Sequence, residues 1–254
     1  MTDDWLQGKI ALVTGSSRGL GAGIVKILAE YGATVIVHHR DSLDRARQVV
    51  QHIEADGGRA TIAQADLTEQ DQVDGMFQTL RRDVGPIDIL VNNAGTSQSK
   101  DIFEISLADW DRMLSVNLTS AFLCSQAVAA DMKARQWGRI VLISSAVARQ
   151  GALFGHVHYA ATKSGMIGFA KTLARTLAPY QVTVNTLGVG MVDTELLHQT
   201  LSDEQIEAAY RRIPLNRFCQ PSEVGHLCAF LASEHAGYIT GAMIDINGGM
   251  VMDG

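Results

Sequence analysis

The chain has 254 residues, of which 46% are hydrophobic and 19% charged, a composition that predicts one large α/β domain or two small ones around a sizeable core. Its formal net charge of −6 argues against nucleic acid or an anionic membrane as the main partner. We expect neither a secretory signal in the acidic segment at residues 1–5 nor a membrane span, because no apolar run approaches the roughly 20 residues that a span needs.

The three cysteines are Cys124, Cys219 and Cys228, an odd number without the spacing of a metal site. Such a set is typical of reduced thiols in a cytosol, where disulfides are rare. We therefore expect a soluble, cytoplasmic protein whose cysteines serve packing rather than nucleophilic chemistry.

Strand and helix signals alternate along the chain. Apolar or β-branched runs predict strands at residues 9–14, 34–38, 61–65, 87–91, 139–143, 182–187 and 243–246. Helical spacing of apolar residues predicts helices at 20–31, 43–55, 73–84, 106–132, 158–178 and 221–231, with one polar helix at 203–212 in an otherwise irregular segment, 188–220. The alternation predicts a single α/β domain, residues 1–254: a doubly wound, mainly parallel seven-stranded sheet with helices on both faces.

The loops that follow the strands are where ligands bind in such a sheet, which points to residues 14–21, 92–97, 144–156 and 188–200. The first of these loops reads Thr14-Gly15-Ser16-Ser17-Arg18-Gly19-Leu20-Gly21. Glycines there let the backbone turn sharply and approach a pyrophosphate, and the following helix N-terminus offers free N–H groups to phosphates. A glycine loop between a strand and an amphipathic helix predicts a dinucleotide site.

The end of the second strand decides between NAD and NADP in such a site. An acidic residue there binds the ribose 2′-hydroxyl, whereas basic groups favour a 2′-phosphate. This chain has His38-His39-Arg40, and Arg18 lies in the glycine loop, so NADP(H) is preferred. Asp41 follows directly, and NAD(H) remains the open alternative.

Tyr159 and Lys163 are the candidate acid/base pair. They are four residues apart in the helix predicted at 158–178, so the phenol and the ammonium share a helix face. A free tyrosine has a pKa of about 10, too high for efficient proton exchange near neutrality. We expect the neighbouring lysine cation to lower that pKa.

The glycine loop, the run Asn92-Asn93-Ala94-Gly95 and the Tyr159/Lys163 pair together resemble the short-chain dehydrogenase/reductase family. The likeness runs from about Lys9 to Gly249 and is strongest to its 3-oxoacyl-(acyl carrier protein) reductase branch. It implies a Rossmann fold, and it implies that Asn117, Ser145, Tyr159 and Lys163 are the catalytic residues. It also implies that the variable segment at about 190–215 forms a lid over the substrate.

The resemblance implies a larger set of cofactor contacts as well. The glycine loop would contact the phosphates and the adenosine, and the end of the third strand would contact the adenine. The Asn-Ala-Gly run would line the ribose, and the segment after the sixth strand would hold the nicotinamide carboxamide. The implied residues are Gly15, Ser17, Arg18, Gly19, Leu20, Gly21, Asp66, Leu67, Asn93, Ala94, Gly95, Val192 and Thr194, with His39 and Arg40 added from the argument above and Tyr159 and Lys163 shared with catalysis.

The sequence departs from the family pattern in three places. Val189 stands where the family usually has proline, in an expected turn at 188–190. The loop from Ser145 to Tyr159 is one residue longer than usual, so Ser144 is an alternative for the serine role. That loop also carries Phe154, His156 and His158, an unusual lining.

The expected function is hydride transfer between NADP(H) and a ketone or secondary alcohol, with a 3-oxoacyl thioester as the first substrate to test. A sugar or polyol is the alternative, favoured by the polar groups His156, His158 and Gln199. A dinucleotide-binding sensor without catalysis is the rival from another class. The resemblance implies a homotetramer, with apolar surface from Leu227, Phe230 and residues 243–252, and we expect no metal site.

Overall fold

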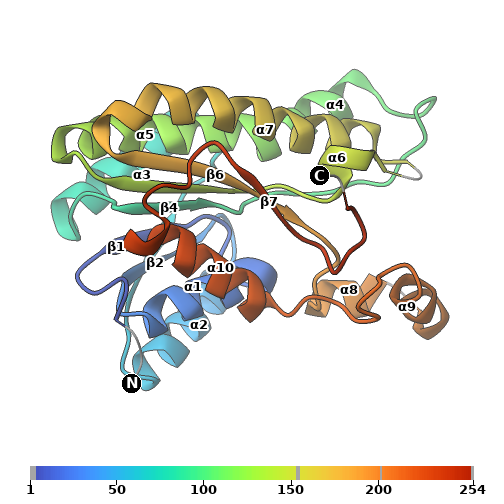
Figure 1. The fold of residues 1–254 in the computed structure, drawn as a ribbon, viewed down its shortest axis with the longest axis horizontal. Helices are drawn as coiled ribbons and strands as arrows, with labels where there is room; N and C mark the ends of the chain where they lie inside the picture. Colours follow the sequence, from blue (N-terminus) through green and yellow to red (C-terminus); the bar gives the residue numbers. More distant parts are fainter. Residues whose placement is uncertain (1–3, 153–154, 201, 253–254) are drawn as a thin grey trace.

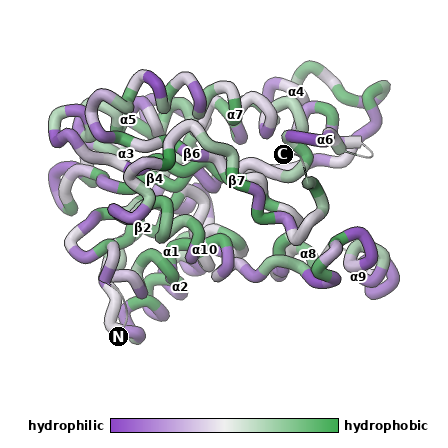
Figure 2. Tube along the Cα trace, in the orientation of Figure 1, coloured by the Kyte–Doolittle hydropathy of each residue, from purple (hydrophilic) through white to green (hydrophobic). Residues whose placement is uncertain are grey.

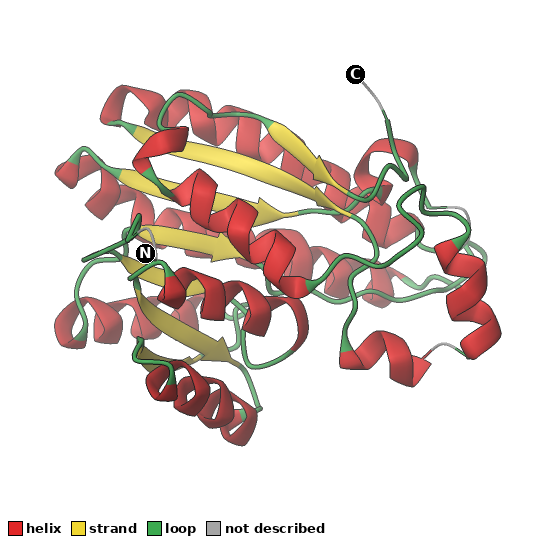
Figure 3. Ribbon diagram, turned by 60° about the horizontal axis from the view of Figure 1, so that its bottom comes forward, coloured by secondary structure: helices red, strands yellow, loops and turns green. Residues whose placement is uncertain are grey.

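The computed structural model describes residues 4–152, 155–200 and 202–252; Phe154 lies outside them. Within this part of the chain a seven-stranded, fully parallel sheet has the order β3-β2-β1-β4-β5-β6-β7, which confirms the doubly wound prediction. Figure 3 shows the strands side by side with helices on both sides. The strands are β1 (Ile10–Val13), β2 (Thr34–His39), β3 (Arg59–Gln64), β4 (Ile89–Asn92), β5 (Gly138–Ile143), β6 (Val182–Val189) and β7 (Met243–Ile246).

Two layers of helices cover the sheet (Figure 1). One face carries α1 (Gly19–Glu30), α2 (Leu43–Ala55) and α10 (Pro221–Ala232), and the other carries α3 (Gln70–Asp83), α5 (Ser120–Arg135) and α7 (Val157–Leu177). Successive strand residues serve opposite faces: in β1, Ala11 and Val13 join the first core and Leu12 joins the second. This burial on both faces explains why the strands read as continuous apolar runs.

The shorter elements surround the carboxyl ends of the strands. They are α4 (Leu107–Leu114), a π-helical turn at Ser115–Thr119, α6 (Val147–Gln150), α8 (Glu195–Thr200) and α9 (Asp203–Tyr210), while short 3-10 turns at Ala178–Tyr180 and Glu234–Ala236 end helices elsewhere. Helices α8 and α9 stand away from the sheet (Figure 1), and α9 is mostly hydrophilic (Figure 2). They occupy the segment expected to form a lid.

Four local predictions were wrong. Residues 188–189 do not form a turn: β6 continues through Val189, which pairs with Ile246, because a β-branched valine can occupy a strand position where proline would end the ladder. Helix α8 was missed in the segment at 188–220, and α6 was missed after β5. The single helix expected at 106–132 is interrupted by the π turn.

The stretch Leu107–Arg135 has the length and apolar composition of a membrane span, contrary to the sequence analysis. In the fold it is a core helix, because one face of its α5 part packs against the sheet. The residues that bury this face are Ala121, Leu123, Cys124, Val128 and Met132.

Helices α1 and α10 cross closely because glycine occupies the contact. A Cβ added at Gly23 would lie 2.3 Å from Pro221 Cβ, whereas one added at Gly168 in α7 would meet nothing within 4 Å. We expect Gly23→Ala to lower the free energy of unfolding by about 1–3 kcal/mol through overpacking. Gly168→Ala, the matched control, should raise it by about 0.5–1 kcal/mol through helix propensity. Urea unfolding measures both, and equal effects of the two substitutions would contradict the close crossing.

Candidate active site

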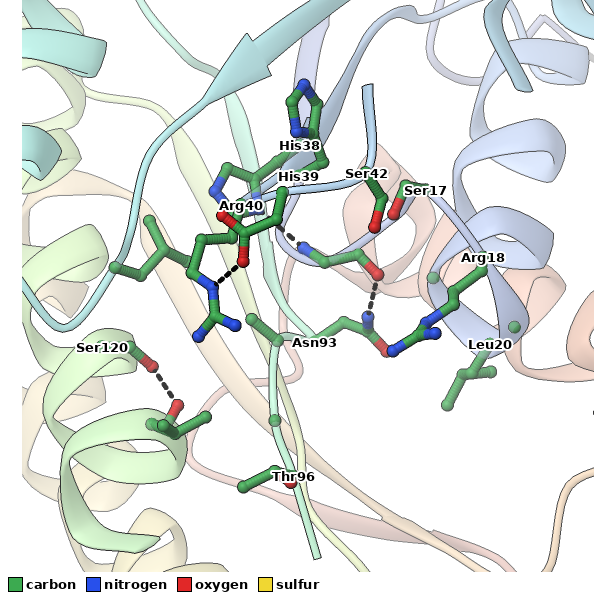
Figure 4. Close-up of a pocket in the computed structure, with 18 of the residues that line it drawn as sticks. Ser17, Arg18, Leu20, His38, His39, Arg40, Ser42, Asn93, Thr96 and Ser120 are labelled. Atoms are coloured by element: carbon green, nitrogen blue, oxygen red, sulfur yellow. Dashed lines mark hydrogen bonds and ion pairs between the residues drawn. The ribbon is translucent and has the colours of Figure 1, made fainter. Parts of the chain in front are cut away.

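A cleft of about 640 Å³ opens at the carboxyl ends of β1, β2 and β4, a size suited to a dinucleotide. It is lined by most of the residues assigned to the cofactor from sequence: Gly15, Ser17, Arg18, Gly19, Leu20, Gly21, His39, Arg40, Asp66, Leu67, Asn93, Ala94, Gly95 and Thr194. Figure 4 shows several of them around the opening, with Arg18 and Arg40 on its walls. Val192, Tyr159 and Lys163 do not line this cleft.

The glycine loop is held open by contacts with the segment after β4. Gly15 has φ +64°, and a Cβ there would lie 3.0 Å from Ala94 Cα, so no larger residue fits without displacing the backbone. The Asn93 amide donates to the carbonyls of Thr14 at 2.8 Å and Gly15 at 3.2 Å. Asn93 was expected to line the ribose side; in the structure its side chain also holds the loop that would bind phosphate.

His38 lines the cleft but was not among the cofactor contacts predicted from the sequence. Its Nδ1 accepts the Gly15 N–H at 2.9 Å, and its Nε2 lies 3.1 Å from the carbonyl of Ala65, which makes Nε2 the donor. Burial lowers the pKa of His38 to about 4, so the ring is neutral and keeps this tautomer. The sequence could have indicated this role for His38. Adjacent strand residues face opposite ways, so only one of the two histidines at the end of β2 can reach the glycine loop.

Positive charge gathers at the end of the cleft next to β2, where Arg18, Arg40 and Arg45 line the wall. Arg40 pairs with the exposed carboxylate of Asp41 and lies 3.9 Å from that of Asp66. His39 is 2% exposed, and neither of its ring nitrogens has a hydrogen-bond partner in the described residues. An orphaned buried imidazole beside a solvated arginine is a ready site for an anionic group.

A hydrogen-bonded turn follows the end of β3 and lines the cleft. Asp66 accepts hydrogen bonds from the Thr68 N–H at 3.0 Å and the Thr68 hydroxyl at 2.7 Å, which lower the pKa of its carboxyl despite the opposing effect of burial. Leu67 is buried in the core below the cleft. This turn fixes the floor on which an adenine would lie.

The four residues proposed as catalytic meet behind the far end of the cleft. Gly95 is the junction: a Cβ there would lie 3.0 Å from Asn117 Oδ1 and 3.6 Å from Lys163 Nζ. The Lys163 Nζ is 5.7 Å from the centre of the Tyr159 ring, and Tyr159 is hydrogen-bonded to Ser145. The residues therefore form one group adjoining the cleft wall.

The two serines after β5 have different partners. Ser144 is buried and donates to the carbonyl of Lys163 at 2.8 Å, which ties β5 to α7. Ser145 instead pairs with Tyr159 and accepts the N–H of Val147. The geometry favours Ser145 for the serine role and gives Ser144 a structural one.

The expected lowering of the Tyr159 pKa by Lys163 is wrong for this structure. Burial raises the pKa of the phenol, and the hydrogen bond with Ser145 offsets part of that rise. Lys163 points its ammonium at the carbonyl of Ile143, 2.7 Å away, rather than at the phenol oxygen. Burial lowers the pKa of Lys163 to about 8, which makes it a group that can exchange a proton near neutrality.

Asn117 is fully buried in the π turn, a distortion that is frequent at functional sites. Its Oδ1 accepts the Thr96 N–H at 2.8 Å, and its Nδ2 donates to the carbonyl of Thr96 at 2.9 Å and lies 3.2 Å from Thr162 Oγ1. These protein partners satisfy the side chain, which joins the loop after β4 to α7.

Other sequence-assigned residues separate in the fold. Thr194 faces the glycine loop, with its Cγ2 3.8 Å from the position of a Cβ at Gly19, whereas Val192 pairs with Cys219 in an isolated bridge. Gln199 lines the dinucleotide cleft and donates to Glu195. His156 packs edge-on against Tyr159 with ring centres 6.1 Å apart, but His158 is buried and bonded to Gln98, so it does not offer the polar group expected for a substrate.

The cysteines pack as expected. Cys124 and Cys228 are fully buried, and burial raises the pKa of the Cys124 thiol to about 12. Among residues 4–152, 155–200 and 202–252, no three His, Cys, Asp or Glu side chains are grouped as a metal site would need.

A doubly wound parallel sheet with a glycine loop, and with a buried lysine and a half-buried tyrosine and serine beside its cleft, defines an oxidoreductase of the dinucleotide-binding class. Residues 15–251 match the sequence profile of the family described as enoyl-(acyl carrier protein) reductase. The chain is 43% identical over 247 residues to the 3-oxoacyl-(acyl carrier protein) reductase of Aquifex aeolicus, covering 96% of this chain and 98% of that protein. It belongs to the short-chain dehydrogenase/reductase family.

Solved structures agree with this assignment. A Serratia marcescens short-chain dehydrogenase/reductase variant has a TM-score of 0.91 and 38% identity, over 97% of this chain and 99% of that chain. A gluconate 5-dehydrogenase from Burkholderia cenocepacia, solved with NADP and tartrate, has a TM-score of 0.91 and 32% identity, over 98% and 97%. These likenesses cover nearly the whole chain.

Lys163 provides a stability test, because a buried cation costs free energy that an apolar residue of similar length does not. Its pKa in the folded chain, about 8, lies below the ordinary 10.5, so below pH 8 the wild type must bury the charge. We expect Lys163→Met to raise the free energy of unfolding of the cofactor-free protein by about 1–2 kcal/mol at pH 7. This is a net gain that already includes the lost hydrogen bond to the Ile143 carbonyl. The gain should shrink from pH 8 to 10.5, where the folded wild type holds a neutral amine. Denaturant unfolding at pH 7 and pH 10 measures this, and a loss of stability at pH 7 would contradict it.

Proposed function

We propose that the protein transfers a hydride between NADP(H) and a ketone or secondary alcohol, with Ser145, Tyr159 and Lys163 as its catalytic residues. The observation that carries the proposal is the joining of two sites at Gly95: a dinucleotide-sized cleft on one side and the Lys163 ammonium on the other. A buried lysine costs folding free energy, and a sensor that only binds a dinucleotide has no use for it. Acid/base catalysis, in contrast, requires a group that supplies protons to the tyrosine.

The bound nicotinamide supplies or accepts the hydride, and the protein supplies the proton and the orientation. In reduction, the Tyr159 hydroxyl donates its proton to the substrate oxygen. The raised pKa keeps the phenol protonated and ready as the acid. The Ser145 hydroxyl, already paired with Tyr159, donates a hydrogen bond to the same oxygen as negative charge develops. Lys163, with a pKa of about 8, returns a proton to the phenolate and takes a proton from solvent in its place near neutral pH.

The residues present fit a nicotinamide dinucleotide. The glycine loop offers a cradle that a Cβ at Gly15 would fill, and the α1 N-terminus that follows it favours phosphate. Arg18 and Arg40 border the end of the cleft next to β2, and a 2′-phosphate there would accept a hydrogen bond from the protonated nitrogen of His39, which has no partner in the described residues. The NADP held by the Burkholderia structure supports the same preference. NAD(H) remains the alternative, because Asp41 and Asp66 offset part of the Arg40 charge.

The substrate class rests on the relatives. Similarity to 3-oxoacyl-(acyl carrier protein) reductases favours a carrier-bound 3-oxoacyl thioester. The second candidate is a sugar acid or polyol, favoured by similarity to the gluconate 5-dehydrogenase solved with tartrate. An NADPH-consumption assay with a 3-oxoacyl thioester and a 5-ketogluconate-type ketone separates the two. Tight NADPH binding without turnover of either would favour a sensor.

A cytoplasmic homotetramer remains part of the proposal. Phe122 on α5 and Val157 on α7 are exposed apolar residues that a subunit contact would cover, whereas Leu227 and Phe230 pack largely against their own core. Free thiols at Cys124, Cys219 and Cys228 suit a reducing compartment.

Removal of the Tyr159 hydroxyl tests the mechanism. We expect Tyr159→Phe to lower kcat by about 10²-fold or more, because the substrate oxygen loses its proton donor, while NADPH affinity changes little. Tyr180→Phe is the matched control, since Tyr180 lies under Lys133 at the opposite end of α7. Steady-state turnover and fluorescence titration with NADPH measure the two quantities. Near-normal turnover of Tyr159→Phe would overturn the mechanism.

Arg40 tests the choice of cofactor. We expect Arg40→Ala to weaken NADPH binding by about 10-fold, because a charge-assisted contact with the 2′-phosphate is lost, and to leave NADH binding nearly unchanged. Arg47→Ala on the outer face of α2, where the arginine pairs with Asp44, is the control. Titration with each cofactor gives the ratio of dissociation constants. Equal losses for NADPH and NADH would contradict a 2′-phosphate site.

A further inference from the structure

The segment after β4 runs along the N-terminal end of α7 and is held there at two points. Thr96 exchanges two backbone hydrogen bonds with the Asn117 side chain, and the Lys100 N–H donates to the carbonyl of Gly155 at 2.6 Å. Figure 1 shows α4 and α6 near this end of α7, and Tyr159 lies in the first turn of α7. The segment therefore forms a wall beside the proposed catalytic group.

A third attachment lies between these two and uses side chains only. Gln98 Nε2 lies 3.3 Å from Asp109 Oδ1, and Gln98 Oε1 lies 3.0 Å from His158 Nε2. A carboxylate can only accept, so the Gln98 amide nitrogen faces Asp109 and its oxygen faces His158. His158 must then donate from Nε2, which fixes its neutral tautomer.

Asp109 anchors this chain of hydrogen bonds. Its Oδ2 accepts from Lys100 Nζ at 2.7 Å and from the Ser106 hydroxyl and N–H at the start of α4. These donors hold the pKa of its carboxyl well below the ordinary range, so Asp109 stays charged across the working pH. The direction of the Gln98 amide is therefore set by a constant charge.

His158 is the residue directly before Tyr159, and its side chain is 1% exposed. Its Nδ1 is buried and has no hydrogen-bond partner in the part of the chain that the structure describes. The charged and titratable groups that face the ring are Asp109 from α4, Lys100 from the wall segment and His156 from the turn before α7. Burial, with Lys100 and His156, outweighs the attraction of Asp109 and lowers the pKa of His158.

We propose that His158 is a positioning residue: its neutral ring, bonded through Gln98 to Asp109, holds the first turn of α7 so that Tyr159 meets Ser145 and the substrate. The proposal rests on the proposed function, because it assigns His158 a part in the same reaction. His158 touches neither substrate nor cofactor in this role. It acts through Tyr159.

The network predicts a dependence on pH that a packing role does not. Protonation of Nδ1 would place a second donor in a buried space without an acceptor, at a helix N-terminus that already favours negative charge. The folded pKa lies below the ordinary 6.5, so the arrangement is intact at neutral pH and is lost as the pH falls below that value. We expect an acid limb in the kcat of ketone reduction, where the general acid Tyr159 itself gives none.

Two substitutions separate hydrogen bonding from titration. His158→Gln keeps a donor near the position of Nε2 and cannot be protonated, so kcat at pH 7.5 should stay within about 3-fold of wild type and the acid limb should vanish. His158→Leu fills the space without a donor, so kcat should fall about 5–10-fold, the scale of one lost hydrogen bond, with the KM for NADPH unchanged. Gln98→Leu should produce the same loss, and the double variant no more than either single one.

His52→Gln, in an exposed position on α2, controls for the loss of a titrating histidine. Amide hydrogen exchange supplies a readout that needs no turnover: in His158→Leu the amides of residues 159–163 should exchange about 5–10-fold faster than in wild type, and those of residues 166–177 should not. An acid limb retained in His158→Gln, or unchanged exchange in His158→Leu, would overturn the positioning role. Wild-type protein that reduces no ketone would overturn the proposed function instead, and the exchange experiment would still decide whether His158 holds α7.

Discussion

The close approach of the glycine loop to the segment after β4 is the constraint on which the site depends. Thr14 Oγ1 accepts the N–H groups of both Asn93 and Ala94 at 2.9 Å, and Gly15 lies against Ala94 without room for a side chain. This contact opens the cleft on one side of the loop. On the other side it brings Gly95 against Asn117 and Lys163, so one set of backbone contacts places the cleft and the proposed acid/base group within reach of each other.

The proposed acid/base group lowers the folding stability of the protein in this position. Lys163 is buried, with the Ile143 carbonyl as its close hydrogen-bond partner, and its pKa of about 8 reflects that burial. The Tyr159 pKa moves the opposite way, because burial favours the neutral form of both groups. A site with a neutral phenol and a readily deprotonated amine is arranged for proton donation near neutral pH. The surrounding fold must offset the free-energy cost, which the α1–α10 contact and the two apolar cores help to do.

Side chains outside the family's catalytic set determine how rigid the site is. His38 holds the glycine loop to the β3 end, and Asn117 and Gln98 hold the segment after β4 to α7. In each case the partner can only donate or only accept a hydrogen bond: it is a carbonyl, an N–H or a carboxylate. That partner fixes the orientation of the neutral ring or amide. A hydrogen bond of this kind is either made or broken, and it acts only on its immediate neighbours. A single protonation at His158 is therefore expected to affect Tyr159, the next residue in the chain.

The sequence by itself determined the order of elements, the parallel sheet, the glycine loop and the i, i+4 pair of Tyr159 and Lys163, because each depends on residues close together in the chain and on periodicity. Tertiary structure alone decided the rest. It extended β6 through Val189 by pairing with Ile246, broke the long helix at Asn117, and distinguished Ser145 from Ser144 by their partners. It also aimed Lys163 at Ile143 rather than at the phenol, and buried His158 in a network instead of the substrate pocket. These outcomes depend on burial and on contacts between residues up to 60 positions apart, as for Gln98 and His158, and local pattern carries no information about either.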